Sequence, residues 1–264
     1  MAGDARVPGL TFGELAEDFD RVRLRYPDVL VDDVLAYSGL EDAGRRALEV
    51  GAGTGKATLA FAARGVPIVA VEPDGAMAAV LARHVADLHN VRIVRSTFEE
   101  YQPEESFRLL FSADAWHWTQ PAVRWRLAGR ALAAGGALAL FWNHGRIDDP
   151  AQRQGMVDVL AEITPTVVVN DNPTEPERLL TEWPGNELAE RPDFSDLVSR
   201  VYPTRLTLSA QDYLTHMSTR SQIRMLAEPI RVRLFEALAD VFDDVVPLAV
   251  DTVLYLARRK PERA

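Results

Sequence analysis

The sequence has 264 residues, of which 47% are hydrophobic and 26% charged, with a formal net charge of −10 and no cysteine. This length and apolar content suffice for one large α/β domain with a buried core. The lack of cysteine excludes disulfides, thiolate metal sites and a cysteine nucleophile. The negative charge, without any basic stripe, argues against a nucleic-acid partner.

The ends of the chain and its apolar runs bear on its location. The first residues, M-A-G-D-A-R-V-P (1–8), contain no apolar core of a signal peptide. No run approaches the roughly 20 apolar residues of a membrane span. We therefore expect a cytoplasmic protein with no membrane partner.

The first predicted strand and helix surround a glycine-rich turn. Residues 45–50 (R-R-A-L-E-V) predict a short strand that ends at three alternating glycines. A helix is expected over K-A-T-L-A-F-A-A-R (56–64), with Thr54 as its cap and Gly65 where a helix ends in the left-handed conformation.

The same alternation of strand and helix continues along the chain. Further strands are predicted over 67–72, 91–95, 107–112 and 136–142, and a helix over about 122–132. Asp74 is expected to cap a helix that carries Met77, Val80 and Leu81 on one face. Strands that alternate with helices in this way imply a parallel sheet with right-handed crossovers.

After Asn143 the pattern changes. Residues 146–195 hold six of the sixteen prolines and one clear helix near 151–163, and such a long interruption usually forms a lid or binding loop. Strand signals return at 198–208 and 250–257. Two helices are expected between them, the first beginning at Ser209 with Asp212 three residues on.

The stretch L-E-V-G-A-G-T-G-K (48–56) indicates a nucleotide-type ligand. A Walker P-loop fails at both ends, because Val50 replaces its first glycine and Ala57 its final serine or threonine. The dinucleotide fingerprint fails at its third glycine, where Lys56 stands.

The pattern that remains is Glu49, Gly51, Gly53 and Gly55. Glycines let the backbone approach a ligand where any Cβ would collide. Glu49 could take an ammonium group, directly or through water, and would repel a pyrophosphate. Glu72 stands 21 residues beyond Gly51, where an acid accepts hydrogen bonds from ribose hydroxyls. Ammonium, carboxylate and ribose together describe S-adenosylmethionine (SAM). The alternatives to a ligand site are that the glycine turn is purely architectural and that Glu72 is a solvated surface residue.

The chain resembles the Rossmann-like (class I) SAM-dependent methyltransferases, in particular the small-molecule type 11/12 group. The resemblance rests on 48–55, V-E-P-D-G-A-M (71–77), S-T-F-E-E (96–100), A-D-A-W-H-W (113–118), L-A-A-G-G-A-L-A-L-F-W-N (132–143) and R-L-R-Y-P (23–27). The last of these is similar to a segment that covers the cofactor, with Leu24 in place of a proline. Ala134 also replaces a proline, and Thr97 stands where relatives often have an acid.

The resemblance implies an α/β fold with a Rossmann-like, seven-stranded, mostly parallel sheet, helices on both faces and an antiparallel last strand. A helical cap or insertion would lie over the substrate site. One methyltransferase domain would cover residues 1–264, with an N-terminal cap (1–40), a SAM-binding core (41–145), a lid or insertion (146–197) and C-terminal strands and helices (198–264).

The resemblance and the glycine turn together predict the residues of the site. Those expected at SAM are Arg23, Tyr26, Glu49, Gly51, Ala52, Gly53, Thr54, Gly55, Glu72, Pro73, Met77, Thr97, Phe98 and Ala113. By the resemblance, Arg23 would meet the methionine carboxylate and Tyr26 would shield the sulfonium. Substrate contacts are expected from Trp116, Trp118, Asn143 and Tyr213. The alternative is core packing for the two tryptophans and a core or surface position for Tyr213. No metal is expected.

His117 follows the fourth predicted strand, at the rim where open α/β sheets bind ligands. An ordinary histidine pKa of about 6.5 suits a catalytic base, and the alternative is that His117 packs or orients a water. We predict a SAM-dependent methyltransferase that acts on a small molecule and leaves S-adenosylhomocysteine. The alternatives are a SAM-binding protein without methyl transfer, such as a binding module or cyclisation catalyst, and a macromolecule methyltransferase.

Overall fold

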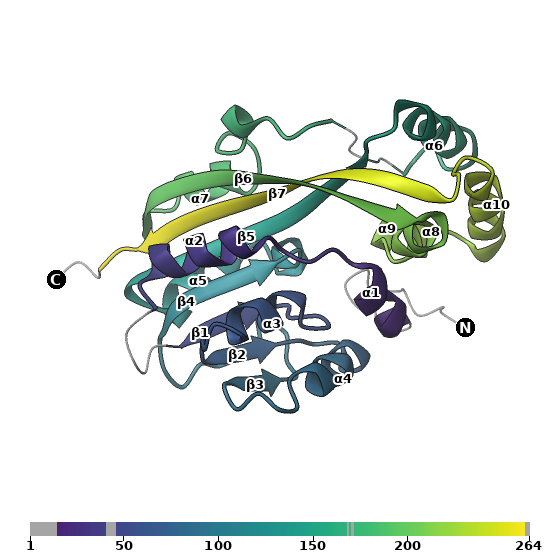
Figure 1. The fold of residues 1–264 in the computed structure, drawn as a ribbon. Helices are drawn as coiled ribbons and strands as arrows, with labels where there is room; N and C mark the ends of the chain where they lie inside the picture. The colour runs from purple at the N-terminus through teal and green to yellow at the C-terminus, as the bar shows by residue number, and fades with distance from the viewer. Residues whose placement is uncertain (1–14, 41–45, 168, 170–171, 262–264) are drawn as a thin grey trace, which may run out of the picture. The chain divides into compact units, whose positions relative to one another are not determined.

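The computed structural model describes residues 15–40, 46–167, 169 and 172–261 (Figure 1). Its chain divides into two compact units that interleave along the sequence. The helical unit comprises residues 1–24, 144–173 and 203–251, and the core unit comprises residues 25–143, 174–202 and 252–264. The amino-terminal residues 1–8 and the start of the first predicted strand, Arg45, lie outside the described residues.

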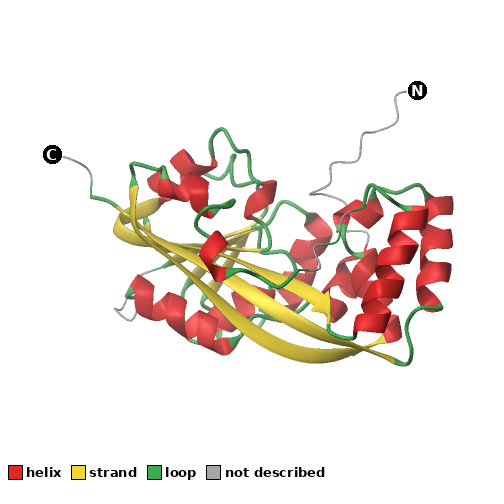
Figure 2. Ribbon diagram, turned by 90° about the horizontal axis from the view of Figure 1, so that it is seen from above, coloured by secondary structure: helices red, strands yellow, loops and turns green. Residues whose placement is uncertain are grey.

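Seven strands form one sheet in the order β3-β2-β1-β4-β5-β7-β6. Their bounds are β1 (Ala47–Val50), β2 (Ile68–Val71), β3 (Val91–Val94), β4 (Phe107–Ala113), β5 (Leu132–Ile147), β6 (Phe194–Ser209) and β7 (Val245–Arg259). The pairs from β3 through to β5 are parallel, and the arrow of β7 runs against its neighbours (Figure 1). The predicted sheet, with its antiparallel last strand, is confirmed. Figure 2 shows its long strands as twisted ribbons.

The core unit covers both faces of its strands with helices. These are α2 (Asp28–Ser38), α3 (Lys56–Ala62), α4 (Gly75–His84), α5 (Arg124–Ala131) and α7 (Gly185–Ala189), with short 3₁₀ turns η3 (Trp116–Trp118) and η4 (Pro176–Arg178). Leu48 packs in one apolar cluster with Trp125 of α5, while Ala47 packs in a second with Phe61 of α3. Because successive residues of a strand point to opposite faces, the fully buried strands β1 and β2 are covered on both sides, whereas the edge strand β3 is only partly buried.

Two of the predicted helix ends are confirmed and one is wrong. Asp74 caps α4, its Oδ1 accepting the N–H groups of Ala76 and Met77 at 2.8 and 3.0 Å. Gly65, with φ of 78°, follows α3 in the left-handed conformation. Thr54 does not cap α3, because the cap is Gly55, with φ of 94° and no side chain to bond. The Thr54 hydroxyl is buried without a hydrogen-bond partner among the described residues.

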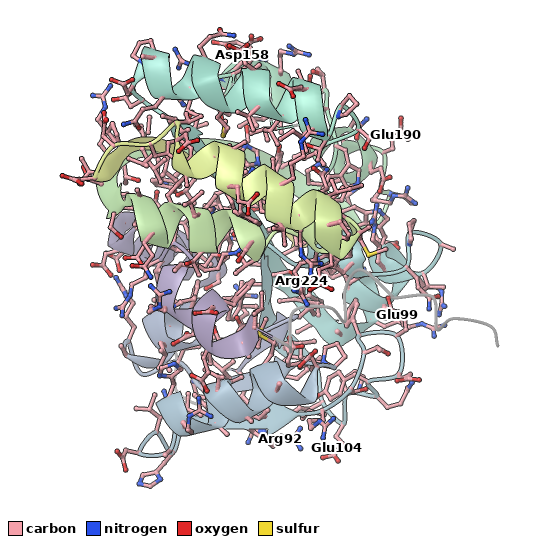
Figure 3. The ribbon with its side chains drawn as sticks, turned by 90° about the vertical axis from the view of Figure 1, so that its right-hand side faces the viewer. Arg92, Glu99, Glu104, Asp158, Glu190 and Arg224 are labelled. Atoms are coloured by element: carbon pink, nitrogen blue, oxygen red, sulfur yellow. The ribbon has the colours of Figure 1, made fainter. Side chains whose placement is uncertain are left out.

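The helical unit has its own apolar core. Its helices are α1 (Ala16–Val22), α6 (Pro150–Ile163), α8 (Ala210–Ser218), α9 (Ser221–Arg224) and α10 (Glu228–Ala239). Helix α10 packs against α6 and α8, and α1 packs against α8. Met156, Met217 and Leu234 are among the side chains buried in this core, whereas Asp158 of α6 is exposed (Figure 3).

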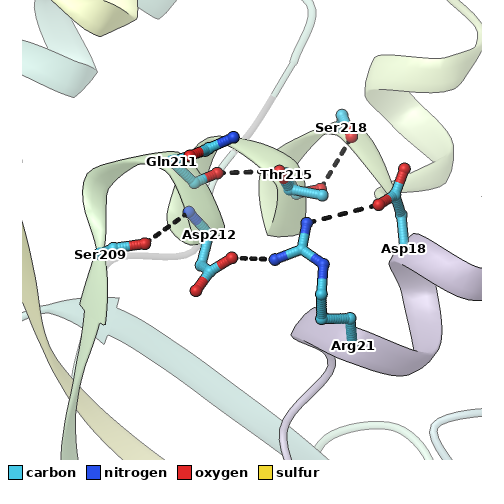
Figure 4. Close-up of polar contacts among 7 residues, drawn as sticks. All are labelled: Asp18, Arg21, Ser209, Gln211, Asp212, Thr215 and Ser218. Atoms are coloured by element: carbon cyan, nitrogen blue, oxygen red, sulfur yellow. Dashed lines mark hydrogen bonds and ion pairs between the residues drawn. The ribbon is translucent and has the colours of Figure 1, made fainter.

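Local capping determines where the helices of this unit begin. The Ser209 hydroxyl accepts the N–H of Asp212 at 3.0 Å, as predicted (Figure 4). Arg21 of α1 pairs with Asp18 and with Asp212 of α8 (Figure 4). Three helices, rather than the predicted two, lie between β6 and β7, because the four-residue α9 is too short to show a helical period. In the described part of the chain, no helix is both long and apolar enough to cross a bilayer.

Candidate cofactor and acceptor site

The glycine turn after β1 contains three residues in the left-handed conformation, with φ of 73° at Gly51, 57° at Gly53 and 94° at Gly55. A Cβ added at Gly51 would lie 2.5 Å from Cβ of Ala115, and one at Gly55 would lie 2.4 Å from Cδ1 of Leu81. At Gly53, an added Cβ would meet no heavy atom of the described residues within 4 Å. Gly51 and Gly55 are therefore required by the packing of the protein, whereas Gly53 borders open space.

Glu72 connects this turn to the end of β2. Its Oε2 accepts the N–H of Gly53 at 2.7 Å, and its Oε1 accepts the N–H of Asp74 at 2.8 Å. Burial raises the pKa of the carboxyl group, and these two N–H donors oppose that rise. The carboxylate is thus held at the carboxyl ends of two neighbouring parallel strands, beside the open face of Gly53.

Glu49 lies in β1 directly beneath the turn and is buried, with 1% of its surface exposed. Its Oε2 accepts the hydroxyl hydrogen of Thr58 at 2.6 Å. Burial raises the pKa of Glu49 to about 8; the Thr58 hydrogen bond opposes this rise and the charge of Glu72 adds to it. Glu49 is therefore mostly protonated at neutral pH, and a cation placed beside it would favour the ionised form.

The turn after β4 lies against the glycine turn through the contact of Ala115 with Gly51. Asp114 in this turn has φ of 52°, which is uncommon for a residue other than glycine. The Tyr26 hydroxyl donates to Oδ2 of Asp114 at 2.9 Å, and the Tyr26 ring packs edge-on against Phe141. Sequence reasoning missed Asp114, although an acid directly after a strand beside the switch in strand order is a usable signal.

The aromatic residues after β4 divide into a buried and an exposed set. Trp116 is fully buried and packs between Phe98 and Trp125, with ring centroids 5.7 and 5.3 Å away. His117 and Trp118 are exposed, and their ring centroids are 4.6 Å apart. This arrangement gives Trp116 a core position, and its predicted substrate contact stays a prediction.

Nδ1 of His117 accepts the indole N–H of Trp142, with 3.3 Å between the two nitrogens. Trp142 stands on β5, the strand next to β4. A neutral imidazole has one acceptor and one donor nitrogen, so this bond assigns the ring proton to Nε2. A catalytic base that acts through Nε2 would need a lone pair on that nitrogen instead of a proton. The role of His117 as the base stays a prediction.

The other predicted cofactor residues of the core unit lie in or beside the turns at this edge of the sheet. Ala52 and Met77 are buried, with 6% and 3% exposed. Pro73 stands between Glu72 and the α4 cap, and Ala113 ends β4. Thr97 bonds through its hydroxyl to the side chain and the N–H of Glu100, at 3.0 and 3.2 Å. Their roles at SAM stay predictions.

Asn143 of β5 forms hydrogen bonds with two other segments of the core unit. Its Oδ1 accepts the hydroxyl of Thr252 at 2.6 Å, and its Nδ2 donates to the carbonyl of Arg25 at 3.4 Å. A contact from Asn143 to a substrate would compete with these bonds. Within the described ranges, no three His, Cys, Asp or Glu side chains form a group that could hold a metal ion.

Two predicted site residues belong to the helical unit. The guanidinium of Arg23 donates to the hydroxyl and carbonyl oxygens of Thr219, both at 3.1 Å, and lies over the ring of Phe19. Tyr213 is buried in the core of that unit, and its hydroxyl donates to Sδ of Met156 at 3.4 Å. These contacts show what the two side chains do within their own unit, and their roles at cofactor and substrate stay predictions.

Comparison with known proteins shows which proteins the chain is similar to. Residues 47–136, from the start of β1 through to β5, match the model of a family described as a methyltransferase domain. The glycine turn, Glu72 and the parallel strand order lie within this match. The segment from residue 47 to residue 136 is thus similar to a methyltransferase domain. The resemblance stated from the motifs is thereby confirmed.

Relatives agree with this assignment. An uncharacterised methyltransferase of Mycobacterium tuberculosis is 35% identical over 163 residues, which are 62% of each of the two chains. The chain thus spans less than two thirds of the length of this curated relative. A proposed type II methyltransferase of Anaeromyxobacter dehalogenans has a similar fold, with a TM-score of 0.61 at 22% identity, covering 91% of this chain and 99% of that one.

A third similar protein is phosphoethanolamine N-methyltransferase 2 of Haemonchus contortus, whose structure contains phosphomonomethylethanolamine and S-adenosylhomocysteine. Its TM-score is 0.54 at 15% identity, covering 97% of this chain and 61% of that one. At these identities the two solved structures show the methyltransferase fold.

Proposed function

We propose that this protein transfers a methyl group from SAM to a small-molecule acceptor. The observation that carries the proposal is the glycine turn, where an added Cβ at Gly53 would meet no heavy atom of the described residues within 4 Å and the Gly53 N–H donates to Glu72. When bound, SAM supplies a methyl group on a positively charged sulfur, which is an electrophile for any well-placed nucleophile. The protein must then bind and orient the cofactor and the acceptor, and it must exclude water.

The residues at the turn fit this cofactor. Gly53 leaves room for the ligand and presents its backbone to it. Glu72 provides a buried carboxylate that would accept hydrogen bonds from the ribose hydroxyls. Glu49 would serve as the partner of the ammonium group, because a cation offsets the cost of ionising this buried acid.

The remaining predicted residues complete the proposed cofactor site. Gly51 and Gly55 hold the turn against Ala115 and Leu81. Tyr26 would shield the sulfonium, and Asp114 fixes its hydroxyl. Arg23 would meet the methionine carboxylate. The residues Ala52, Thr54, Pro73, Met77, Thr97, Phe98 and Ala113 would form the surroundings of the adenosine.

A small acceptor is favoured over a macromolecule for two reasons. The formal net charge of −10 disfavours the phosphate backbone of a nucleic acid. The structurally similar Haemonchus contortus enzyme contains the small acceptor phosphomonomethylethanolamine. We also propose that residues 1–264 act as one methyltransferase domain, with the cap, core, lid and C-terminal parts predicted from the sequence.

Methyl transfer can be tested with SAM that carries a trideuterated methyl group. The protein is incubated with this cofactor and fractions of small metabolites, and mass spectrometry follows S-adenosylhomocysteine and labelled products. We expect labelled small molecules in amounts that match the S-adenosylhomocysteine formed, and none with Gly53→Val. Binding of SAM without turnover on any fraction would favour the non-catalytic alternative, and label in RNA or protein would favour a macromolecular substrate.

A further inference from the structure

The hydrogen bond from Trp142 fixes the chemical character of His117. The indole N–H is only a donor, so the nitrogen that it meets, Nδ1, must carry a lone pair. The proton of the neutral ring is therefore on Nε2. For Nε2 to take a proton from a substrate, the ring proton would first have to move to Nδ1, where it would face the indole N–H.

An array of aromatic rings extends from this histidine through Trp118 on one side and Trp142 on the other, all within the core unit. Trp118 lies beside His117, with 4.6 Å between ring centroids, and Trp183 lies edge-on to Trp142 at 5.5 Å. Trp118 and Trp183 remain 40% and 38% exposed. Two tryptophans left this exposed in one array are unusual on a protein surface, since burying such rings contributes strongly to stability.

A charge beside Trp183 is already compensated within the protein. The guanidinium of Arg124 lies 5.3 Å from the ring centroid of Trp183 and is nearly buried. It pairs with Glu187 at 2.7 Å, and the same carboxylate oxygen accepts the indole N–H of Trp125 at 2.8 Å. Arg124 is therefore engaged by Glu187, and His117 is the polar group that contacts both Trp118 and Trp142.

The array lies beside the proposed cofactor site. Ala115, two residues before His117, is in contact with Gly51 of the glycine turn. The two features occupy neighbouring strand ends, those of β1 and β4, which pair in parallel. A ligand seated beside His117 and Trp118 would thus lie close to the proposed cofactor site.

We infer that His117 is a hydrogen-bond donor that holds an already ionised oxygen of a planar, aromatic acceptor, with Trp142 as its positioning residue and Trp118 and Trp183 as the seat of the ring. This inference rests on the proposed methyl transfer and specifies its acceptor as an aromatic carboxylate or phenolate. The ionised oxygen forms the new C–O bond while the C–S bond breaks and its electron pair stays on sulfur. No proton is released, so no base is required.

The tautomer of His117 can be measured directly by NMR of protein labelled with ¹⁵N-histidine. Loss of one set of signals in His117→Gln assigns the residue among the five histidines. We expect a protonated Nε2 and an unprotonated Nδ1. In Trp142→Phe, which lacks the indole N–H, His117 should no longer favour the tautomer that is protonated on Nε2. A His117 with its proton on Nδ1 would overturn the inference, whatever the activity.

The acceptor class is tested by binding benzoate and 1-naphthoate, each beside its neutral amide, in the presence of S-adenosylhomocysteine. The acids should bind about 10-fold or more tightly than the amides, as expected for a hydrogen bond to a charged group. His117→Gln, which keeps a donor, should retain most of this preference, and His117→Ala should lose it. Trp183→Ala should weaken both members of each pair, and the exposed His89→Ala should leave all four affinities unchanged.

The outcomes separate this inference from the proposed function. If S-adenosylhomocysteine binds but acids and amides bind equally, or if neither acid binds, the acceptor class is wrong and the cofactor site stands. The inference also fails if His117→Gln loses the preference for acids as fully as His117→Ala does, because a hydrogen-bond donor at this position would then not account for that preference. If S-adenosylhomocysteine itself does not bind, the proposed function fails.

Discussion

The two sides of the proposed site are built in different ways. On the β1–β2 side, the site is formed mainly by the backbone conformation of the glycine turn. Its hydrogen bonds are between residues close in the chain: Thr58 and Glu49 are 9 residues apart, and Gly53 and Glu72 are 19 apart. On the β4–β5 side, side chains do the work: Trp142 reaches His117 across 25 residues, and Trp183 comes from a segment still further on. The first side is a local motif, whereas the second exists only after the sheet has formed.

The largest expected effect concerns the open face of the local motif. Gly53→Val should reduce SAM affinity at least about 100-fold, because its side chain would fill the space left for the ligand. Gly65→Val is the matched control, since Gly65 also has a left-handed backbone, with φ of 78°, and no heavy atom of the described residues near an added Cβ. Both variants should lose similar stability, and only Gly53→Val should lose binding in a calorimetric titration. Equal binding by both would show that Gly53 does not face the ligand.

The next effect concerns Glu49 and pH. Its pKa in the folded protein is about 8, above the ordinary 4.5, so the folded state keeps a proton that the unfolded state has lost. Stability should therefore fall as pH rises from about 4.5 to about 8, by roughly 1.4 kcal/mol per pH unit from this group. Glu49→Gln cannot ionise and should lack this decline.

Urea unfolding of both proteins at pH 5 and pH 8 measures the difference. We expect the wild type to lose about 3 kcal/mol more than Glu49→Gln between these values. Parallel losses in the two proteins would mean that Glu49 ionises without cost. A bound ammonium ligand should reduce the difference, because it offsets the ionised acid.

A smaller effect is expected at Glu72. Removing its carboxylate should weaken SAM binding by about 1.5–3 kcal/mol, the range for hydrogen bonds to a charged group. Glu104, an exposed acid in the loop before β4 (Figure 3), provides the control Glu104→Ala, which should bind as the wild type does. Unchanged affinity in Glu72→Ala would show that the carboxylate only braces the turn through Gly53 and Asp74.

The smallest effect is expected at Tyr26. Tyr26→Phe removes the hydroxyl that donates to Asp114 and should cost about 1 kcal/mol of stability, while the ring keeps its contact with Phe141. If the ring shields the sulfonium, SAM affinity should change little. A loss of affinity as large as that of Glu72→Ala would instead give the hydroxyl or Asp114 a direct role.

The sequence predicts the local side of the site well. Short apolar runs followed by glycines or a capping acid predict strand and helix ends, as at Asp74 and Gly65. The error at Thr54 arose because Gly55 supplies the cap by its backbone conformation, which side-chain chemistry does not reveal. The long strands β5, β6 and β7 were predicted too short, because their missed ends contain residues that are typical of strand breaks: Gly135 in β5, Asp196 in β6 and Pro247 in β7.

The β4–β5 side of the site could not be predicted from the sequence in this way. Nothing in the spacing of His117, Trp142 and Trp183 indicates that they meet, because their contacts depend on strand order and on a segment after the parallel strands. The tautomer of His117 was beyond prediction for the same reason. Trp116 and Trp118 are two positions apart, yet one is buried and the other exposed. Both lie in the 3₁₀ turn η3, in which side chains two positions apart point in different directions.

The central claim, that this fold binds SAM for methyl transfer, is tested most directly by calorimetric titration of the purified protein. SAM and S-adenosylhomocysteine should each bind at one site, without added metal, and NAD and ATP should produce no binding heat. Binding of NAD or ATP, with no heat from either sulfur compound, would contradict the account.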